Sequence, residues 1–205
     1  MIECQKKINI DDCVVLYIGA APFISYNVIK KLYPKTKWIS YDTNRFIFDK
    51  SDKNVKIENK FFTNEEINKI KNTFKNYDRK YLLYINDMRV NPDEKSVLKD
   101  MIQQQEWILR LNPFASSIKF RLPYNTEDRV DFNYKYHLKT NIKKCVNDII
   151  YLDGTIYLQT YAPKRSTETR LISFRPYKLT KYDIIEYEEK LNYLNEKIRN
   201  KTFYI

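Results

Sequence analysis

Short apolar runs alternate with helical segments along the first half of this chain, and this alternation restricts the possible fold more than any other feature. The run Cys13–Ile18 (CVVLYI) contains no charged residue, which is typical of a strand buried on both faces of a sheet. Strands of this kind occur in parallel sheets that helices cover. The pattern therefore predicts an α/β protein with a mostly parallel central sheet flanked by helices. Strand-rich segments near the C-terminal end predict added antiparallel strands.

Apolar periodicity and turn residues locate the individual elements. The expected strands are Cys13–Ile18, Lys37–Tyr41, Val55–Glu58, Tyr81–Ile85, Ser117–Leu122, Ile149–Leu152, Thr155–Tyr161 and Thr169–Phe174. The expected helices lie near Ile24–Tyr33, from Thr63 to about Phe74, over Asp93–Leu111, and from about Lys181 to Asn200. The spacing of Thr63 and Glu66 is that of a capping box. The dipeptide Asp153-Gly154 predicts a hairpin between the strands that flank it.

Composition narrows the class of protein. A length of 205 residues fits a single domain, 1–205, and 18 Tyr, 11 Phe and 2 Trp supply the apolar surface that folding needs. The sequence has no apolar run of the roughly 20 residues that span a bilayer, so we expect no membrane partner. One histidine and three cysteines without CxxC spacing argue against a metal site.

The charge balance points towards a polyanionic partner. Lys and Arg number 37 against 26 Asp and Glu, which gives a formal net charge of +11. One explanation is a solvated, lysine-rich surface. The other, which we favour, is phosphate binding, because an excess of this size attracts polyanions over several ångströms. Charge alone does not separate DNA from RNA.

Three residues lie at the carboxyl ends of expected strands, the positions where open α/β sheets bind ligands. Gly19 follows the first strand, Asp42 ends the second, and Asp87 follows the strand that begins at Tyr81. A glycine there lets the backbone approach a ligand, and an acid about twenty residues later accepts hydrogen bonds from ribose hydroxyls. Simpler explanations are a tight strand-to-helix turn for Gly19 and a turn aspartate for Asp42. The three positions together favour a nucleotide-like ligand.

A lysine lies within an expected strand. Alternation in SSIKFRL places Ser117, Lys119 and Arg121 on one face, which is either a solvated edge or a functional face. Desolvation favours the neutral form of a lysine side chain, the form that accepts a proton. Glu168, at the start of a later strand, could hold this lysine, or it could be a surface residue paired with Arg170.

Several segments resemble one known family in the right order and spacing. From about Cys13 to Lys201 the chain is similar to the poxvirus-type cap-specific mRNA (nucleoside-2′-O-)-methyltransferases, which also serve as poly(A) polymerase regulatory subunits. The segments that carry the resemblance are VLYIGAAP, KWISYD, LNPFASSIKFR, APKRSTETRLIS and LTKYDIIEYEEKLNYLNEKIRNK. The resemblance implies a Rossmann-like, S-adenosylmethionine-dependent methyltransferase fold. It also implies 2′-O-methylation of the first transcribed nucleotide of capped viral mRNA. The alternative is a catalytically weak or inactive methyltransferase-like subunit that binds RNA or acts as a scaffold in a viral capping, transcription or polyadenylation complex.

The resemblance also implies a role for individual residues. The residues that match the S-adenosylmethionine site are Tyr17, Gly19, Asp42, Phe61, Phe62, Asp87 and Arg89. Asp87, Lys119 and Glu168 match three members of a Lys–Asp–Lys–Glu catalytic tetrad, in which Lys119 removes the 2′-hydroxyl proton and the two acids orient it. Tyr124 and Glu188 match positions that hold the methylated guanine of the cap. The implied partners are capped RNA and another viral subunit, and the implied location is the cytoplasm, in a viral factory or virion.

The sequence departs from the family pattern at a few positions. Phe23 replaces a motif glycine and is expected to crowd the cofactor. Thr126 replaces an acidic cap contact, and Arg165 stands where the family has an aromatic residue. The family also has a tetrad lysine and a cap-stacking aromatic upstream of the first strand, and neither Lys6 nor Lys7 has the right spacing for that lysine.

Overall fold

The computed structural model describes residues 1–48, 52–75, 80–89, 91, 93–122, 148–159 and 166–199. The chain divides into two compact units. The first comprises Met1–Met88 and Glu106–Ile118, and the second comprises Arg89–Gln105 and Lys119–Ile205. A single domain over 1–205 stays a prediction.

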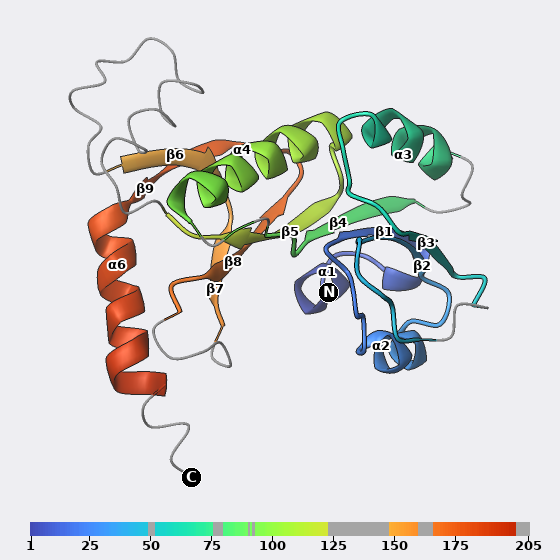
Figure 1. Ribbon diagram of the computed structural model, residues 1–205, viewed down its shortest axis with the longest axis horizontal. Helices are drawn as coiled ribbons and strands as arrows, with labels where there is room; N and C mark the ends of the chain where they lie inside the picture. The colour runs from blue at the N-terminus through green and yellow to red at the C-terminus, as the bar shows by residue number, and fades with distance from the viewer. Residues whose placement is uncertain are drawn as a thin grey trace. The chain divides into compact units, whose positions relative to one another are not determined.

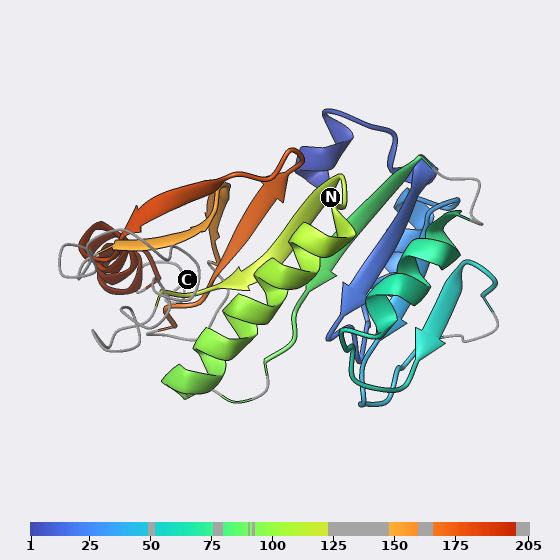
Figure 2. The same ribbon diagram turned by 90° about the horizontal axis from the view of Figure 1, so that it is seen from above.

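A parallel sheet forms the centre of the first unit (Figures 1 and 2). Its strands are β1 (Cys13–Ile18), β2 (Lys37–Tyr41), β3 (Val55–Glu58), β4 (Tyr81–Asn86) and β5 (Ala115–Phe120), in the order β3-β2-β1-β4-β5. All four neighbouring pairs are parallel. The mostly parallel sheet predicted from the apolar runs is therefore confirmed.

Helices explain why the central strand β1 is apolar and buried. Helices α2 (Tyr26–Leu32) and α3 (Glu66–Lys75) lie on opposite faces of the sheet (Figure 1). Val14, Val15 and Leu16 of β1 consequently have no solvent exposure. A short helix, α1 (Ile2–Gln5), and a 3-10 turn, η1 (Ile10–Asp12), precede β1. Helix α4 (Glu94–Leu111) begins in the second unit and ends in the first.

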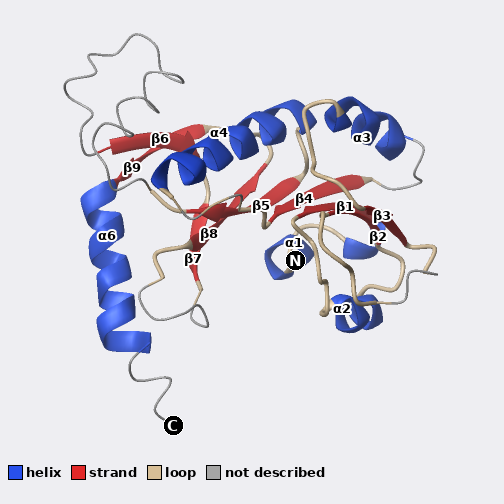
Figure 3. Ribbon diagram, in the orientation of Figure 1, coloured by secondary structure: helices blue, strands red, loops and turns tan. Residues whose placement is uncertain are grey.

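Antiparallel strands characterise the second unit (Figure 3). Strand β6 (Asp148–Leu152) pairs with β9 (Leu179–Asp183), and β7 (Thr155–Leu158) pairs with β8 (Thr169–Phe174). Strand β8 is the neighbour of β5 in the larger sheet. The last two residues of β5, Lys119 and Phe120, belong to this unit. Helix α6 (Ile184–Tyr193) and a π-helical segment, η3 (Leu194–Arg199), follow β9. The late antiparallel strands expected from the sequence are confirmed.

The hairpin predicted across Asp153-Gly154 is wrong. The two flanking strands pair with different partners, because β6 belongs to a sheet with β9 and β7 to a sheet with β8. Asp153 N–H donates to the carbonyl oxygen of Lys178 (2.8 Å), so the connection is tied to the segment before β9. A side chain at Gly154 would lie 2.5 Å from the carbonyl oxygen of Ile172. This glycine therefore permits close packing against β8 rather than a two-residue turn.

The start predicted for the last helix is also wrong. Residues 179–183 form strand β9, in which exposed and half-buried side chains alternate. The helix begins at Ile184, where the Asp183 carboxylate accepts a hydrogen bond from Glu186 N–H (3.1 Å) and caps the first turn. The spacing of Ile184, Tyr187, Leu191, Leu194 and Ile198 predicts one apolar stripe along the helix. The first four of these side chains are buried, whereas Ile198 is 39% exposed. Within the described ranges, no helix is both long and apolar enough for a membrane span.

Candidate functional site

The carboxyl ends of three strands meet at one edge of the first unit's sheet. Ile18, the last residue of β1, is paired with Tyr41 of β2 and with Asn86 of β4. Gly19, Asp42 and Asp87 each directly follow one of these residues. The structure thus brings these three predicted residues to the same edge of the sheet, where open α/β proteins bind ligands.

Gly19 is required by the backbone around it. Its φ is +71°, and a Cβ at this position would lie 2.6 Å from the backbone nitrogen of Met88. Two hydrogen bonds hold this close approach: Gly19 N–H donates to the Tyr41 carbonyl oxygen (2.9 Å), and Asp87 N–H donates to the Ile18 carbonyl oxygen (2.8 Å). This contact is a steric reason for the glycine that the sequence did not indicate, and a role of Gly19 at a ligand stays a prediction. The close approach leaves the loops after β1 and β4 in contact at the sheet edge.

The Asp42 carboxylate joins two loops at this edge. Its Oδ2 accepts a hydrogen bond from Ala21 N–H (2.9 Å), and its Oδ1 accepts one from Asn44 N–H (2.8 Å). The side chain is half-buried. Each carboxylate oxygen has two lone pairs, so both retain the capacity to accept a further hydrogen bond. An acid held in this way suits recognition of a pair of hydroxyl groups.

The aromatic residues expected near the cofactor separate into core and surface. Phe62 is buried and packs edge-on against Tyr41 (5.0 Å between centroids) and Trp107 (4.8 Å). Phe61 is 63% exposed, so its ring is accessible to a ligand. Tyr17 is half-buried and packs edge-on against Phe23 at 5.2 Å.

Phe23 lies within an aromatic cluster of the first unit's core. Only 4% of its surface is exposed, and its ring contacts the rings of Tyr26, Trp38 and Phe48 at 5.2–5.7 Å between centroids. Its φ is +53°, a backbone conformation that favours glycine. Phe23 therefore adopts a glycine-like backbone conformation while its side chain fills the core. That the Phe23 side chain crowds a cofactor stays a prediction.

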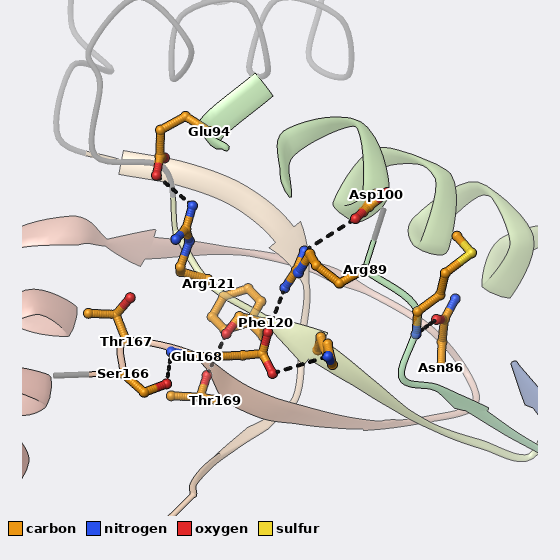
Figure 4. Close-up of polar contacts among 12 residues, drawn as sticks. Asn86, Arg89, Glu94, Asp100, Phe120, Arg121, Ser166, Thr167, Glu168 and Thr169 are labelled. Carbon is orange, nitrogen blue, oxygen red and sulfur yellow. Dashed lines mark hydrogen bonds and ion pairs between the residues drawn. The ribbon is translucent and has the colours of Figure 1, made fainter. Parts of the chain in front are cut away.

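The second unit contains a chain of alternating charges (Figure 4). Lys119 Nζ lies 3.6 Å from Glu168 Oε1, and Arg89 Nη2 donates to Glu168 Oε2 at 3.0 Å. Arg89 Nη1 lies 3.6 Å from Asp100 Oδ2. The Lys119 and Glu168 side chains are 19% and 26% exposed, so solvent reaches both only in part. Of the two possibilities raised for Glu168, the structure supports contact with Lys119.

Alternation along β5 accounts for the position of Lys119. Ile118 and Phe120 have no exposure, whereas Lys119 and Arg121 are half-buried. Arg121, directly after the strand, donates from Nη2 to Glu94 Oε1 in the first turn of α4. The burial pattern therefore agrees with the predicted common face of Lys119 and Arg121. Each of these cations lies beside a carboxylate, Glu168 for Lys119 and Glu94 for Arg121.

The expected cap residues are only partly described. Tyr124, Thr126 and Arg165 lie outside the described residues. Glu188 is exposed on α6, beside a cavity of about 440 Å³. The other residues that line this cavity are Thr167, Ile185, Glu189, Leu191, Asn192 and Asn195.

Comparison with known proteins identifies the family. A family model described as the poly A polymerase regulatory subunit matches residues 2–205. The chain belongs to this family. A Fowlpox virus (strain NVSL) protein named cap-specific mRNA (nucleoside-2′-O-)-methyltransferase is 30% identical over 215 residues, which cover 96% of this chain and 63% of that protein. Its namesake from Myxoma virus (strain Lausanne) is 28% identical over 216 residues, covering 97% of this chain and 58% of that protein. The chain thus spans 58–63% of the length of these poxvirus relatives.

A solved structure agrees on the fold of this poly A polymerase regulatory subunit family member. Bluetongue virus VP4, described as a multifunctional RNA-capping production line, matches with a TM-score of 0.61 at 18% identity. The match covers 87% of this chain and 28% of VP4. The chain therefore has a Rossmann-like methyltransferase fold, as its βα alternation and family resemblance predicted.

Two supporting residues of this family member were not predicted. The buried Asn86 side chain accepts a hydrogen bond from Met88 N–H (2.9 Å) and donates to Tyr84 Oη (2.9 Å), which fixes the turn that carries Asp87. Asp100 is buried on α4 beside Arg89. A sequence signal exists for Asp100, because it lies three residues after Val97 and next to Met101 on the apolar face of the helix. An acid at such a position indicates a buried ion pair.

Proposed function

We propose that this protein binds S-adenosylmethionine and transfers its methyl group to the 2′-oxygen of the first transcribed nucleotide of capped viral mRNA. The observation that carries the proposal is the 3.6 Å approach of the partly buried Lys119 amine to the Glu168 carboxylate, at two positions that match the family's catalytic tetrad. Membership of the family and the names of its poxvirus relatives support the same activity.

The sheet edge of the first unit has groups that fit S-adenosylmethionine. The half-buried Asp42 carboxylate can accept hydrogen bonds from the ribose hydroxyls, and the exposed Phe61 ring can pack against the adenine. Gly19 keeps the loop beside Asp42 free of a side chain. When bound, the sulfonium supplies an electrophilic methyl group.

Lys119 would act on the accepting hydroxyl. In its neutral form the amine can take the proton from the ribose 2′-hydroxyl as the oxygen attacks, which is general base catalysis. Glu168 holds the amine from one side and stabilises its charge after the proton has moved. Asp87, the remaining tetrad match in this sequence, follows β4 in the first unit. Correct placement of the 2′-oxygen against the methyl group matters as much as proton removal, because the displacement is in line.

Recognition of the cap is assigned to Tyr124 and Glu188. An aromatic ring stacks on the cationic methylguanine, and a carboxylate accepts hydrogen bonds from its ring N–H groups. The cavity of about 440 Å³ beside Glu188 offers space for such contacts. Another viral subunit is proposed as a partner, with the cytoplasm of the infected cell as the location.

Methyl transfer to a defined RNA position tests the proposal. Incubation with capped RNA and labelled S-adenosylmethionine should place label on the 2′-oxygen of the first nucleotide. Lys119→Ala and Lys119→Arg should each lose at least about 100-fold in rate, because an arginine keeps the charge but does not become neutral. Lys178→Ala, at an exposed lysine of the second unit, is the matched control and should retain activity. Full activity in Lys119→Arg would contradict the base role.

A second candidate is an RNA-binding or scaffolding subunit without catalysis, which the regulatory-subunit name of the family model favours. Such a subunit would bind RNA yet show neither methyl transfer nor heat of binding in calorimetric titration with S-adenosylhomocysteine. Micromolar binding of S-adenosylhomocysteine together with label at the 2′-oxygen would exclude it.

A further inference from the structure

Asp100 is an acid in an apolar setting. It lies on the buried side of α4, where its side chain is 4% exposed and its neighbours along the helix, Val97 and Met101, belong to the core. A buried carboxylate is costly unless a cation and hydrogen bonds compensate it. The compensating cation is Arg89, whose Nη1 lies 3.6 Å from Asp100 Oδ2.

Arg89 connects this buried acid to the candidate catalytic pair. Its other terminal nitrogen, Nη2, donates to Glu168 Oε2 at 3.0 Å, and Lys119 Nζ lies 3.6 Å from Glu168 Oε1. The four charges therefore alternate along one row. Figure 4 labels Asp100, Arg89 and Glu168, and Lys119 follows Glu168 as the fourth member. Each oxygen of Glu168 faces a different cation. All four residues belong to the second unit.

We infer that Asp100 is a positioning residue for methyl transfer. It neutralises and anchors Arg89, so that the guanidinium holds one oxygen of Glu168 and leaves the other for Lys119. The inference rests on the proposed function for the role of Lys119. It assigns to Asp100 an action on the reaction through Arg89, whose Nη1 lies 3.6 Å from Asp100 Oδ2.

The charge balance of the row explains how Asp100 acts at a distance. Two carboxylates and two cations give the row no net charge, and removal of the Asp100 charge leaves it with an excess of one positive charge. Arg89 would then depend on Glu168 alone and draw it away from Lys119. Among the neighbouring charged groups, Arg121 and Glu94 form an ion pair with each other. Lys119 would be misplaced, and its neutral form would be favoured.

Asp100→Asn separates this role from a structural one, because it keeps the shape of the side chain and removes its charge. We expect kcat to fall about tenfold, as for outer residues that orient catalytic groups, while KM for RNA changes little. The acid limb of the pH–rate profile should move to lower pH by about half a unit or more, because the excess positive charge favours neutral Lys119. Glu186→Gln removes the same charge from an exposed ion pair with Lys190 and should alter neither kcat nor the profile. A fall in kcat with an unmoved profile would overturn the inference.

Chemical labelling of the Lys119 amine does not depend on methyl transfer, so it tests this inference separately from the proposed function. Acetic anhydride modifies only neutral amines, and peptide mapping by mass spectrometry reports the modification of Lys119 as a function of pH. If Lys119 titrates at lower pH in Asp100→Asn than in the wild type, the coupling holds even for a protein without methyl transfer. Identical labelling curves would overturn it.

A conservative variant covers the case in which Asp100→Asn does not fold. Asp100→Glu retains the charge but displaces the carboxylate by one methylene, so kcat should fall while the labelling curve of Lys119 stays in place. An Asp100→Glu protein with unchanged kcat, or with a shifted labelling curve, would contradict the positioning role.

Discussion

Two residues in the loop after β1 share an unusual backbone conformation for different reasons. Gly19 (φ +71°) is fixed by contact, because a Cβ there would meet the backbone of Met88. Phe23 (φ +53°) accepts a conformation that costs about 1–2 kcal/mol for a residue with a side chain. Burial of its ring among Tyr26, Trp38 and other aromatic residues offsets that cost. Family comparison detected the replacement of a glycine, but only the structure shows where the ring goes.

Substitutions at Phe23 should separate ring burial from backbone strain. Phe23→Ala removes the ring and keeps the strain, so we expect a loss of about 3–5 kcal/mol in the free energy of unfolding. Phe23→Gly also relieves the strain and should be more stable than the alanine variant by about 1 kcal/mol. Urea unfolding followed by tryptophan fluorescence measures both values. Ile24→Ala, at a side chain 71% exposed, should stay within about 0.5 kcal/mol of the wild type. Equal stability of the two Phe23 variants would argue against strain at this position.

At the scale of elements, the sequence predicts strands better than it predicts their partners. Strands β1, β2 and β3 have the predicted bounds, because short apolar runs between turn residues are local signals. Pairing is not local: Asp153-Gly154 suggested a hairpin, whereas β6 pairs with β9, about thirty residues away along the chain. Strand β9 was missed because its apolar and polar residues also fit the periodicity of the helix that follows.

The Glu66 side chain contacts other elements instead of forming the capping box that its sequence position suggested. Its spacing from Thr63 suggested a capping box, but α3 begins at Glu66 and the carboxylate contacts other groups. Hydrogen bonds from Lys69, Tyr41 and Lys60 outweigh the opposing effect of burial and lower the pKa of Glu66 to about 2. The carboxylate therefore joins the first turn of α3 to the end of β2.

The lowered pKa of Glu66 predicts a pH-dependent stability. Because the folded-state pKa lies below the ordinary value of 4.5, the ionised carboxylate stabilises the fold above about pH 4.5, and this stabilisation is lost as the pH falls towards 2. Glu66→Gln should therefore lower the free energy of unfolding at pH 7 and differ little from the wild type near pH 2. Urea unfolding at pH 7, 4 and 2.5 checks this. Glu65→Gln, at the exposed neighbouring position, should show a much smaller difference at pH 7. A difference for Glu66→Gln that is constant with pH would be inconsistent with the ionic contribution.

At the scale of the whole molecule, the candidate site combines residues that are remote in sequence. Glu168 and Arg89 are separated by 79 positions, yet they share a hydrogen bond. The sequence indicated Lys119 and Glu168 through strand alternation and family resemblance, and it placed Arg89 beside the cofactor. It did not indicate that Arg89 joins Glu168 to Asp100, because that contact depends on which strands and helix pack together. Residue types are visible in a sequence, whereas the sharing of one carboxylate between two cations is not.

The excess positive charge of the whole chain predicts RNA binding that depends on salt. With a net charge of +11, binding should weaken as salt rises, with a log–log slope near −0.7 for each phosphate contact on a single strand. The basic segment Lys135–Lys144, which lies outside the described residues, is the expected phosphate contact. Substituting Lys139, Lys143 and Lys144 together should weaken capped and uncapped RNA alike, because phosphate contacts do not read the end of the strand. Tyr124→Ala should instead weaken capped RNA by about 1–3 kcal/mol, the usual contribution of stacking on an aromatic ring. Fluorescence anisotropy with matched capped and uncapped oligonucleotides across a salt series separates the two effects. Equal losses for both RNAs in Tyr124→Ala would exclude its role at the cap, and an affinity independent of salt would exclude the electrostatic contribution.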